Sequence, residues 1–251
     1  MNPHRTPWRP NFRDALILAG ESDVKRHHAY PAAKTGDATA AVRLVRDLVS
    51  DDAIDALGRR FEGQRPIVAS IHAQEGNGIN EIPEALAVRM AQRLVWDTDP
   101  SLVQTNIVNH TGADGFSRLA RQALFSGDVS RGAEYLIVDD FIGQGGTMAN
   151  FRGHIEHGGA SVIGAVALTG KPYSARLALS DQLLGELREK HGGLEDWWRN
   201  RFGFGYEALT QSEARYLART AHADTISDRI AEAGQGQHSR HGQGAVGSDL
   251  D

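Results

Sequence analysis

Two adjacent carboxylates, Asp139 and Asp140, follow a run of apolar residues and precede a glycine-rich segment. Carboxylates in this position can accept hydrogen bonds from sugar hydroxyls, or they can bind a hard cation such as Mg²⁺ through oxygen. The segment after them ends in Gly145-Gly146-Thr147. Glycines let the backbone approach a ligand closely, so this combination favours a phosphorylated sugar as the ligand.

The elements expected around the carboxylates form a strand–loop–helix junction. Residues 136–138 have the apolar character of a buried strand, and Met148, Phe151 and Ile155 recur at helical spacing beyond the glycines. Such a junction directs free backbone N–H groups and the positive end of a helix toward one place. It therefore favours binding of a phosphate group.

Two other interpretations of the glycine-rich segment can be weighed against this one. Gly143 and Gly145 could begin a dinucleotide-binding fingerprint, but Met148 occupies its third glycine position. Two carboxylates beside a dinucleotide pyrophosphate would also repel it unless a cation lay between them. The second alternative is a purely structural turn, in which the Asp side chains cap local backbone groups.

The segment resembles the signature of the type I phosphoribosyltransferases, which has an apolar strand, an acidic pair and a loop ending in Gly-Gly-Thr. The resemblance implies that Asp139 and Asp140 are catalytic residues, and that they bind Mg²⁺ and the ribose hydroxyls of phosphoribosyl pyrophosphate (PRPP). It also implies that the segment after Val138 as a whole binds PRPP. The residues concerned, besides the acidic pair, are Phe141, Ile142, Gly143, Gln144, Gly145, Gly146 and Thr147.

The sequence departs from the family pattern at two positions of this loop. Family members commonly carry Asp or Thr, and then Thr or Ser, where this chain has Gly143 and Gln144. An acidic residue at the first position contacts the base in enzymes that act on 6-oxopurines. Its replacement by glycine argues against hypoxanthine or guanine as the acceptor.

Other segments fall where the family places further parts of its site. After an apolar stretch at 66–71 comes the expected pyrophosphate-binding loop, and residues 109–118 match a mobile loop that closes over the reacting centre. Arg118, and also Arg121, could neutralise pyrophosphate there, and Arg118 is assigned a catalytic role. Lys171 is expected to contact the nucleobase. The pyrophosphate-binding residues are His72, Ala73, Gln74, Glu75 and Gly76.

Composition excludes several classes of protein. The chain has 251 residues, a formal net charge of −5 and no cysteine. Disulfides and cysteine-based metal sites are therefore excluded, and the negative charge argues against a nucleic-acid partner. No apolar run approaches the roughly 18 residues needed to span a membrane. The N-terminus lacks the apolar core of a signal peptide, so a cytoplasmic protein is expected.

Strands that alternate with helices predict an α/β fold, with a mainly parallel sheet flanked by helices. Strands are expected at 66–71, 102–108, 135–138 and 161–168, and a helix from Asp37 to about Leu57. Four regions follow from this pattern. They are an irregular N-terminal arm at 1–36 that could form a hood, a phosphoribosyltransferase-like core at 37–175, a helical extension at 176–232 and a disordered tail at 233–251.

The arm and the extension contain the candidates for a hood that would select the base. In the arm these are His28, Tyr30 and Lys34. In the extension, an aromatic stretch from Trp197 to Tyr206 could stack on a base or form a small hydrophobic core. Residues 210–213 have the Thr-x-x-Glu spacing of a helix capping box.

The resemblance implies a glycosyltransferase of nucleotide metabolism. Such an enzyme transfers ribose 5-phosphate from PRPP to a nitrogen acceptor, a nucleobase or a related compound, and releases pyrophosphate with Mg²⁺ as the cofactor. A homodimer would be in keeping with similar proteins. Two alternatives stay open: a non-catalytic protein that senses PRPP or nucleotides, and a phosphoribosyl hydrolase.

Overall fold

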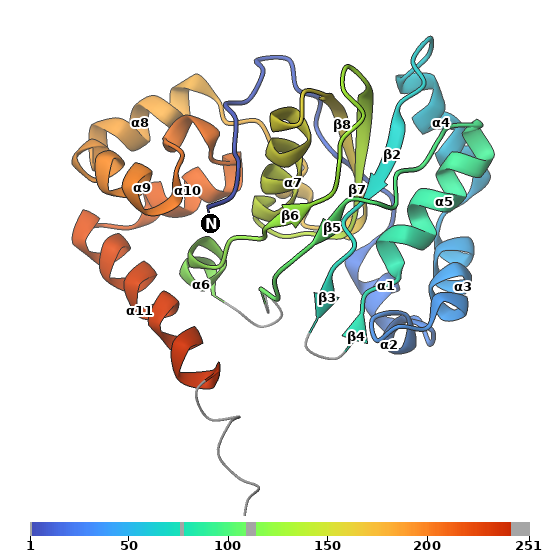
Figure 1. The fold of residues 1–251 in the computed structure, drawn as a ribbon, viewed down its shortest axis with the longest axis horizontal. Coiled ribbons are helices and arrows are strands. Elements are labelled where there is room, and N and C mark those ends of the chain that lie inside the picture. The colour runs from blue at the N-terminus through green and yellow to red at the C-terminus, as the bar shows by residue number, and fades with distance from the viewer. Residues whose placement is uncertain (1, 76–77, 109–113, 242–251) are drawn as a thin grey trace, which may run out of the picture.

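A four-stranded parallel sheet lies at the centre of the computed structural model, which describes residues 2–75, 78–108 and 114–241 (Figure 1). Every pairing between neighbouring strands of this sheet is parallel. The mainly parallel α/β sheet predicted from the sequence is therefore confirmed. In spatial order the strands are β1 (Leu16–Ile17), β8 (Ser161–Gly170), β7 (Glu134–Ile142) and β2 (Ile67–Ser70).

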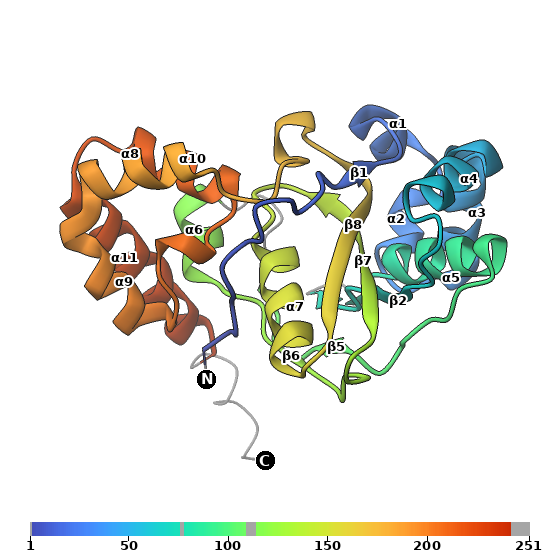
Figure 2. The same cartoon turned by 90° about the horizontal axis from the view of Figure 1, so that it is seen from above.

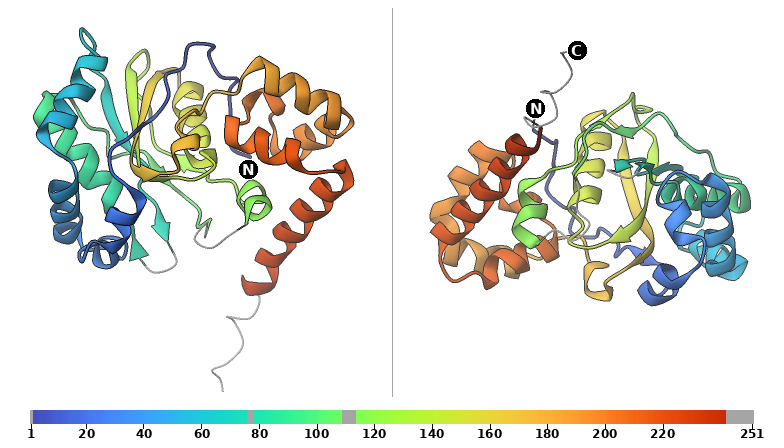
Figure 3. Two further views of the ribbon diagram at one scale, coloured as in Figure 1. Left: turned by 180° about the vertical axis from the view of Figure 1, so that it is seen from behind. Right: turned by 90° about the horizontal axis from the view of Figure 1, so that it is seen from below.

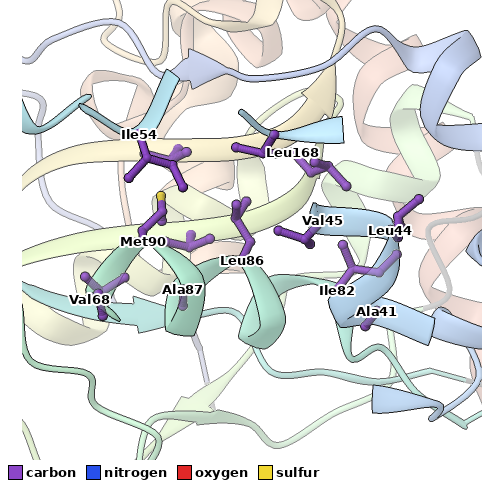
Figure 4. Close-up of a cluster of buried hydrophobic side chains, with 14 of the residues drawn as sticks. Ala41, Leu44, Val45, Ile54, Val68, Ile82, Leu86, Ala87, Met90 and Leu168 are labelled. Carbon is purple, nitrogen blue, oxygen red and sulfur yellow. The ribbon is translucent and has the colours of Figure 1, made fainter. Parts of the chain in front are cut away.

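Helices cover both faces of the sheet because its strands are apolar on both sides. In β7, Leu136 and Val138 pack toward one face, and Tyr135 and Ile137 pack toward the other. The first face is covered by the helices that Figure 4 shows in part, with Leu86 and Met90 among the buried side chains. These helices are α1 (Glu21–Arg26), α2 (Tyr30–Ala33), α3 (Ala38–Leu48), α4 (Asp51–Arg60) and α5 (Ile82–Leu94).

The second face is covered by α7 (Gly146–His157), whose Met148, Phe151 and Ile155 are buried against the strands. These are the three residues whose spacing predicted this helix. Four short strands lie outside the main sheet and form two antiparallel pairs. They are β3 (Gln74–Glu75) with β4 (Gly78–Ile79), and β5 (Val103–Gln104) with β6 (Phe125–Ser126).

The C-terminal lobe, residues 176–241, packs beside α7 on the side away from α1–α5 (Figures 2 and 3). Trp198, Phe202 and Tyr206 are buried in its core, so the aromatic stretch forms a hydrophobic core. The predicted capping box of Thr210 and Glu213 is present. The elements of the lobe are α8 (Asp181–His191), α9 (Glu195–Phe202), α10 (Gln211–Arg219) and α11 (Ala223–His241), with the short α6 (Gly115–Ala120) packed against α11. Single 3₁₀ turns occur at Pro172–Ser174, Gly192–Leu194 and Tyr206–Ala208.

The structure differs from the prediction in the first half of the chain. The helix expected from Asp37 to Leu57 is two helices, because Ser50 accepts a hydrogen bond from Ala53 N (3.2 Å) and caps a new helix. The strand expected at 102–108 is limited to β5. Its neighbour Asn106 instead binds loop backbone, since its side chain accepts a hydrogen bond from Leu124 N (2.8 Å).

Both ends of the chain are more regular than predicted. The region 1–36, expected to be irregular, contains β1, α1 and α2, and Pro31 occupies the first turn of α2, where a proline is tolerated. Residues 233–241, expected to be disordered, continue α11, because Ile226 and Ile230 anchor a helix that can then propagate. Residues 242–251 lie outside the described ranges. Within those ranges, no helix is both long enough and apolar enough to cross a bilayer.

Candidate functional site

The carboxyl ends of β2, β7 and β8 meet at one edge of the sheet. Ile71 N donates to Val138 O (2.8 Å), and Lys171 N donates to Ile142 O (3.2 Å), so the segments leaving all three strands begin side by side. In open α/β sheets this edge is where ligands bind. The predicted site segments at 72–75, 139–147 and 171 all begin at this edge.

The phosphate loop, residues 143–147, joins β7 to α7 and presents unbonded amides. Gly145 has a φ of 81°, a left-handed conformation that glycine adopts without strain, and no side chain caps the helix after it. The amide N–H groups of residues 143–147 donate no hydrogen bond to the described part of the chain. Several unsatisfied donors at the N-terminus of a twelve-residue helix are suited to binding an anion.

The two acids occupy different environments because consecutive residues of a strand point to opposite faces. Asp139 is buried and accepts a hydrogen bond from Asp140 N (2.8 Å). Burial, together with the neighbouring charge of Asp140, raises the pKa of Asp139 well above its ordinary value. The two side chains are therefore not equivalent ligands, because burial disfavours the charged form of Asp139.

Asp140 lies on the opposite face and forms an ion pair with Lys34, at 3.2 Å between Nζ and Oδ2. Lys34 follows α2 directly, so the short helices before α3 lie next to the acidic pair. The sequence marked Lys34 as a candidate for a base-selecting hood. It gave no indication that Lys34 would contact an acid 106 positions away in the chain.

Arg118, predicted to be catalytic, lies against the phosphate loop. A Cβ atom at position 143 would come within 2.8 Å of Nη1 of Arg118. The guanidinium therefore occupies the space that a side chain at Gly143 would need, which gives a physical reason for the departure from the family pattern. The Nε atom of Arg118 is buried and has no hydrogen-bond partner among the described residues.

The expected pyrophosphate-binding segment is largely a small hairpin. Its backbone pairs Gln74 with Ile79 in β3 and β4, while His72 pairs with Val103 and Ala73 O accepts from Asn80 N (3.2 Å). A Cβ atom at Gly78 would lie 2.7 Å from Thr35 O, so the hairpin packs directly beside the residue after Lys34. Glu75 belongs to β3, but Gly76 and the first half of the predicted mobile loop (109–113) lie outside the described residues.

Lys171 follows β8 directly, but its ammonium group is already paired. Its Nζ lies 2.5 Å from Oε2 of Glu21, which also pairs with Lys25 at 2.6 Å. The hydrogen bond that Lys171 donates to Glu21 raises the pKa of Lys171, and the bonds that Glu21 accepts from Lys171 and Lys25 lower the pKa of Glu21. Lys25 Nζ also lies 5.6 Å from the ring centroid of Phe141. This group forms one wall next to the acidic pair.

The acidic pair can supply only part of a magnesium site. In the described ranges, no three His, Asp or Glu side chains are grouped so that they could hold a metal ion. Mg²⁺ commonly uses one or two carboxylates together with water and substrate phosphates. Asp140 fits that arrangement, with the remaining oxygens coming from the ligand.

The phosphate loop is held from behind by residues that sequence reasoning did not connect with it. Arg5 donates to Gly146 O (3.2 Å), and Thr210 Oγ1 donates to Gln144 O (2.6 Å). Arg5 lies in the N-terminal arm and Thr210 caps α10. The Thr-x-x-Glu spacing at 210–213 predicted the start of a helix. It did not predict that Thr210 would also contact the phosphate loop.

Comparison with known proteins places similar sequences in two bacteria. The chain is 37% identical over 230 residues to the protein TraN of Escherichia coli, which covers 91% of this chain and 51% of TraN. It is 36% identical over 151 residues to an uncharacterized protein of Haemophilus influenzae, covering 60% of this chain and 34% of that protein. The chain thus spans about half the length of TraN and about a third of the second protein. No protein-family model matches it.

Two solved enzyme structures align with part of this chain. An adenine phosphoribosyltransferase from Thermoanaerobacter pseudethanolicus aligns with a TM-score of 0.36 and 20% identity, covering 55% of this chain and 72% of the enzyme. A hypoxanthine phosphoribosyl transferase from Trypanosoma cruzi aligns with a TM-score of 0.38 and 12% identity, covering 69% and 77%. Scores this low leave the function to be argued from the site itself.

Proposed function

We propose that the protein is a phosphoribosyltransferase, which binds PRPP at the carboxyl edge of the sheet and transfers ribose 5-phosphate to a nitrogen acceptor. The observation that carries the proposal is the set of unbonded amides at residues 143–147, beside an acidic pair and an arginine. Amides and a guanidinium favour phosphate, and a carboxylate favours sugar hydroxyls. A phosphorylated ribose requires these groups side by side.

The groups of the site have separate roles in this proposal. The amides of the phosphate loop and the guanidinium of Arg118 bind the 5′-phosphate, and Asp140 accepts hydrogen bonds from the ribose hydroxyls. The backbone of residues 72–75 lies along the pyrophosphate. Mg²⁺ would be held by Asp140 together with the ligand's own oxygens, and it would neutralise charge on the departing pyrophosphate.

In the reaction, the bond between the anomeric carbon and the pyrophosphate oxygen breaks while a bond to the acceptor nitrogen forms on the opposite face of the sugar. The proton that the acceptor nitrogen loses passes to the departing pyrophosphate. Positive charge develops on the sugar during this exchange, and the carboxylate of Asp140 stabilises it. The phosphate loop fixes the other end of the sugar and so aligns the reacting carbon. No covalent enzyme intermediate is needed.

The acceptor is proposed to be a nucleobase or a related nitrogen compound, bound beside the wall of Glu21, Lys25, Lys171 and Phe141. This wall offers both an anion and cations to the polar edge of a base, and it offers an aromatic ring. Lys171 can donate to an exocyclic oxygen if it exchanges its partner Glu21 for the ligand.

Pyrophosphate release from PRPP and Mg²⁺, measured with and without each nucleobase, tests the proposal. Release that depends on a base supports transfer, and the Asp140→Asn variant should then lose at least about 100-fold in turnover, the usual scale for a lost transition-state contact. Asp52→Asn, an exposed carboxylate on α4, is the matched control and should retain activity.

The other outcomes of this assay distinguish the alternatives. Release that does not depend on any base indicates a hydrolase, and binding of PRPP without release indicates a sensing protein. If PRPP does not bind at all, the assignment of the site is wrong.

A further inference from the structure

Arg5 lies directly behind the phosphate loop, and its side chain is 1% exposed. Its guanidinium donates to Gly146 O (3.2 Å), to Glu213 Oε2 (2.6 Å) and to Gln122 Oε1 (2.9 Å), while Nε donates to Asn150 Oδ1 (2.5 Å). One side chain thus joins the arm, the phosphate loop, α7 and α10.

The cap of α10 holds a second point of the same loop. Thr210 Oγ1 donates to Gln144 O (2.6 Å), and Thr210 N donates to Glu213 Oε2 (2.9 Å). The packing is close, because a Cβ atom at Gly145 would lie 2.6 Å from Leu177, and one at Gly146 would lie 2.5 Å from Glu213. The phosphate loop therefore cannot move backward.

Holding these two carbonyls also fixes two amides. In a planar trans peptide, C=O and N–H point in opposite directions, and the described chain contains no cis peptide. The carbonyl of Gln144 shares its peptide plane with the N–H of Gly145, and the carbonyl of Gly146 shares its plane with the N–H of Thr147. Bonds that pull the carbonyls backward therefore direct both N–H groups forward, away from Arg5 and Thr210.

We propose that Arg5 and Thr210 are positioning residues that orient the amides of Thr147 and Gly145 toward the ligand's phosphate without touching the ligand. This inference rests on the proposed function, because it assumes that a phosphate occupies the loop. The preorganised amides avoid an ordering cost when the ligand binds. The N-terminal arm and the C-terminal lobe thus each contribute one residue that supports the phosphate loop.

The experiment measures the Kd of the full chain for ribose 5-phosphate by calorimetry, together with the thermal midpoint of each variant. Thr210→Val removes the donor to Gln144 O, and Arg5→Lys keeps a positive charge for Glu213 but cannot reach all the partners of the guanidinium. We expect each to weaken binding about tenfold, equivalent to ~1.4 kcal/mol. Thr210→Ser keeps the hydroxyl and should restore the wild-type Kd.

Trp8→Phe provides the control for general loosening, because Trp8 Nε1 donates to Leu209 O (2.7 Å) and fastens the arm without touching the phosphate loop. It should lower the thermal midpoint and leave Kd unchanged. Wild-type Kd values in both Thr210→Val and Arg5→Lys would overturn the positioning role while leaving the proposed function intact. If the wild-type protein binds neither ribose 5-phosphate nor PRPP, the proposed function itself fails.

Discussion

At the scale of single residues, the site depends on the alternation of side chains along β7. Asp139 and Asp140 are neighbours in sequence, yet one is buried toward α7 and the other pairs with Lys34 on the opposite face. Burial destabilises the charged form of Asp139 in the folded state, and the nearby charge of Lys34 offsets this only in part. Asp139 thus lowers the free energy of unfolding while it lies at the edge of the sheet where a ligand would bind. Residues that serve function at the expense of stability are common in binding sites.

Asp139→Asn is expected to stabilise the protein at neutral pH. The unfolded chain ionises Asp139 near its ordinary pKa of 3.8, while burial keeps the folded form protonated to higher pH. The free energy of unfolding therefore falls as pH rises from 3.8 to the pKa of Asp139 in the folded state. Asn cannot ionise, so the variant does not show this fall. The gain in unfolding free energy should grow as pH rises above 3.8 and vanish below that pH. Thermal unfolding at several pH values would contradict this if the variant were less stable throughout.

Gly143→Ala is expected to displace the guanidinium of Arg118, because the new methyl group would lie 2.8 Å from its Nη1 atom. Because the clash involves only the far end of the Arg118 side chain, which can rotate away, the free energy of unfolding should change by less than about 1 kcal/mol. The affinity for ribose 5-phosphate should fall several-fold, since a cation moves away from the amides. Unchanged affinity in a calorimetric titration would show that Arg118 does not contact the phosphate.

At the scale of elements, the N-terminal arm runs along α7 between the sheet and the C-terminal lobe (Figure 2). Arg152 of α7 is buried, and it donates to Thr6 O and Pro7 O and lies 3.9 Å from the ring centroid of Trp8. Burial lowers the pKa of Arg152 to about 10, which leaves it charged at neutral pH. The arm is therefore an integral layer of the fold.

Gly153→Ala should detach the arm from α7. A Cβ atom at this position would lie 1.8 Å from His4 O and 2.9 Å from the Cα atom of Arg5, so the backbone of the arm must move. We expect a loss of about 1–3 kcal/mol in unfolding free energy. The matched control is Gly185→Ala in α8, which has open space around it and should gain up to about 1 kcal/mol from helix propensity. Equal stability of the two variants in urea denaturation would contradict this packing.

The elements that the sequence predicted well are those with local patterns. Helical spacing identified α7, and the apolar run before Asp139 identified β7, so the phosphate loop between them followed. The contact of Arg5 with Glu213 spans 208 positions, and that of Lys34 with Asp140 spans 106. No local pattern encodes such pairs, because they exist only once the chain has folded. The supporting side of the site was therefore not predictable from the sequence.

At the scale of the whole molecule, the described residues form three hydrophobic clusters, and the arm and the phosphate loop connect the lobe to the α7 side of the sheet. The sheet has one cluster on each face, and the C-terminal lobe has its own around Trp198. The ion pair of Arg5 and Glu213 is almost fully buried between the arm and the lobe. Removing one partner of such a pair leaves a buried unpaired charge, which costs about 3–5 kcal/mol.

The lobe and the sheet should therefore unfold together. In a variant that carries Trp8→Phe and Trp96→Phe, tryptophan fluorescence reports on Trp197 and Trp198 of the lobe, and far-ultraviolet circular dichroism reports on all helices and strands. The midpoints from the two signals should coincide, as for a single cooperative unit. Two separated transitions would show that the lobe is an independent domain, and the coupling between the arm, the lobe and the phosphate loop would then be weak.

The amides of residues 143–147 can be observed directly by ¹H–¹⁵N correlation NMR during a titration with ribose 5-phosphate. If these amides bind a phosphate, Gly143, Gly145, Gly146 and Thr147 should shift downfield together and saturate with one Kd. Asp140 should shift in the same titration. Shifts confined to other regions, or no shifts at millimolar ligand, would contradict the central claim that this loop binds a phosphorylated pentose.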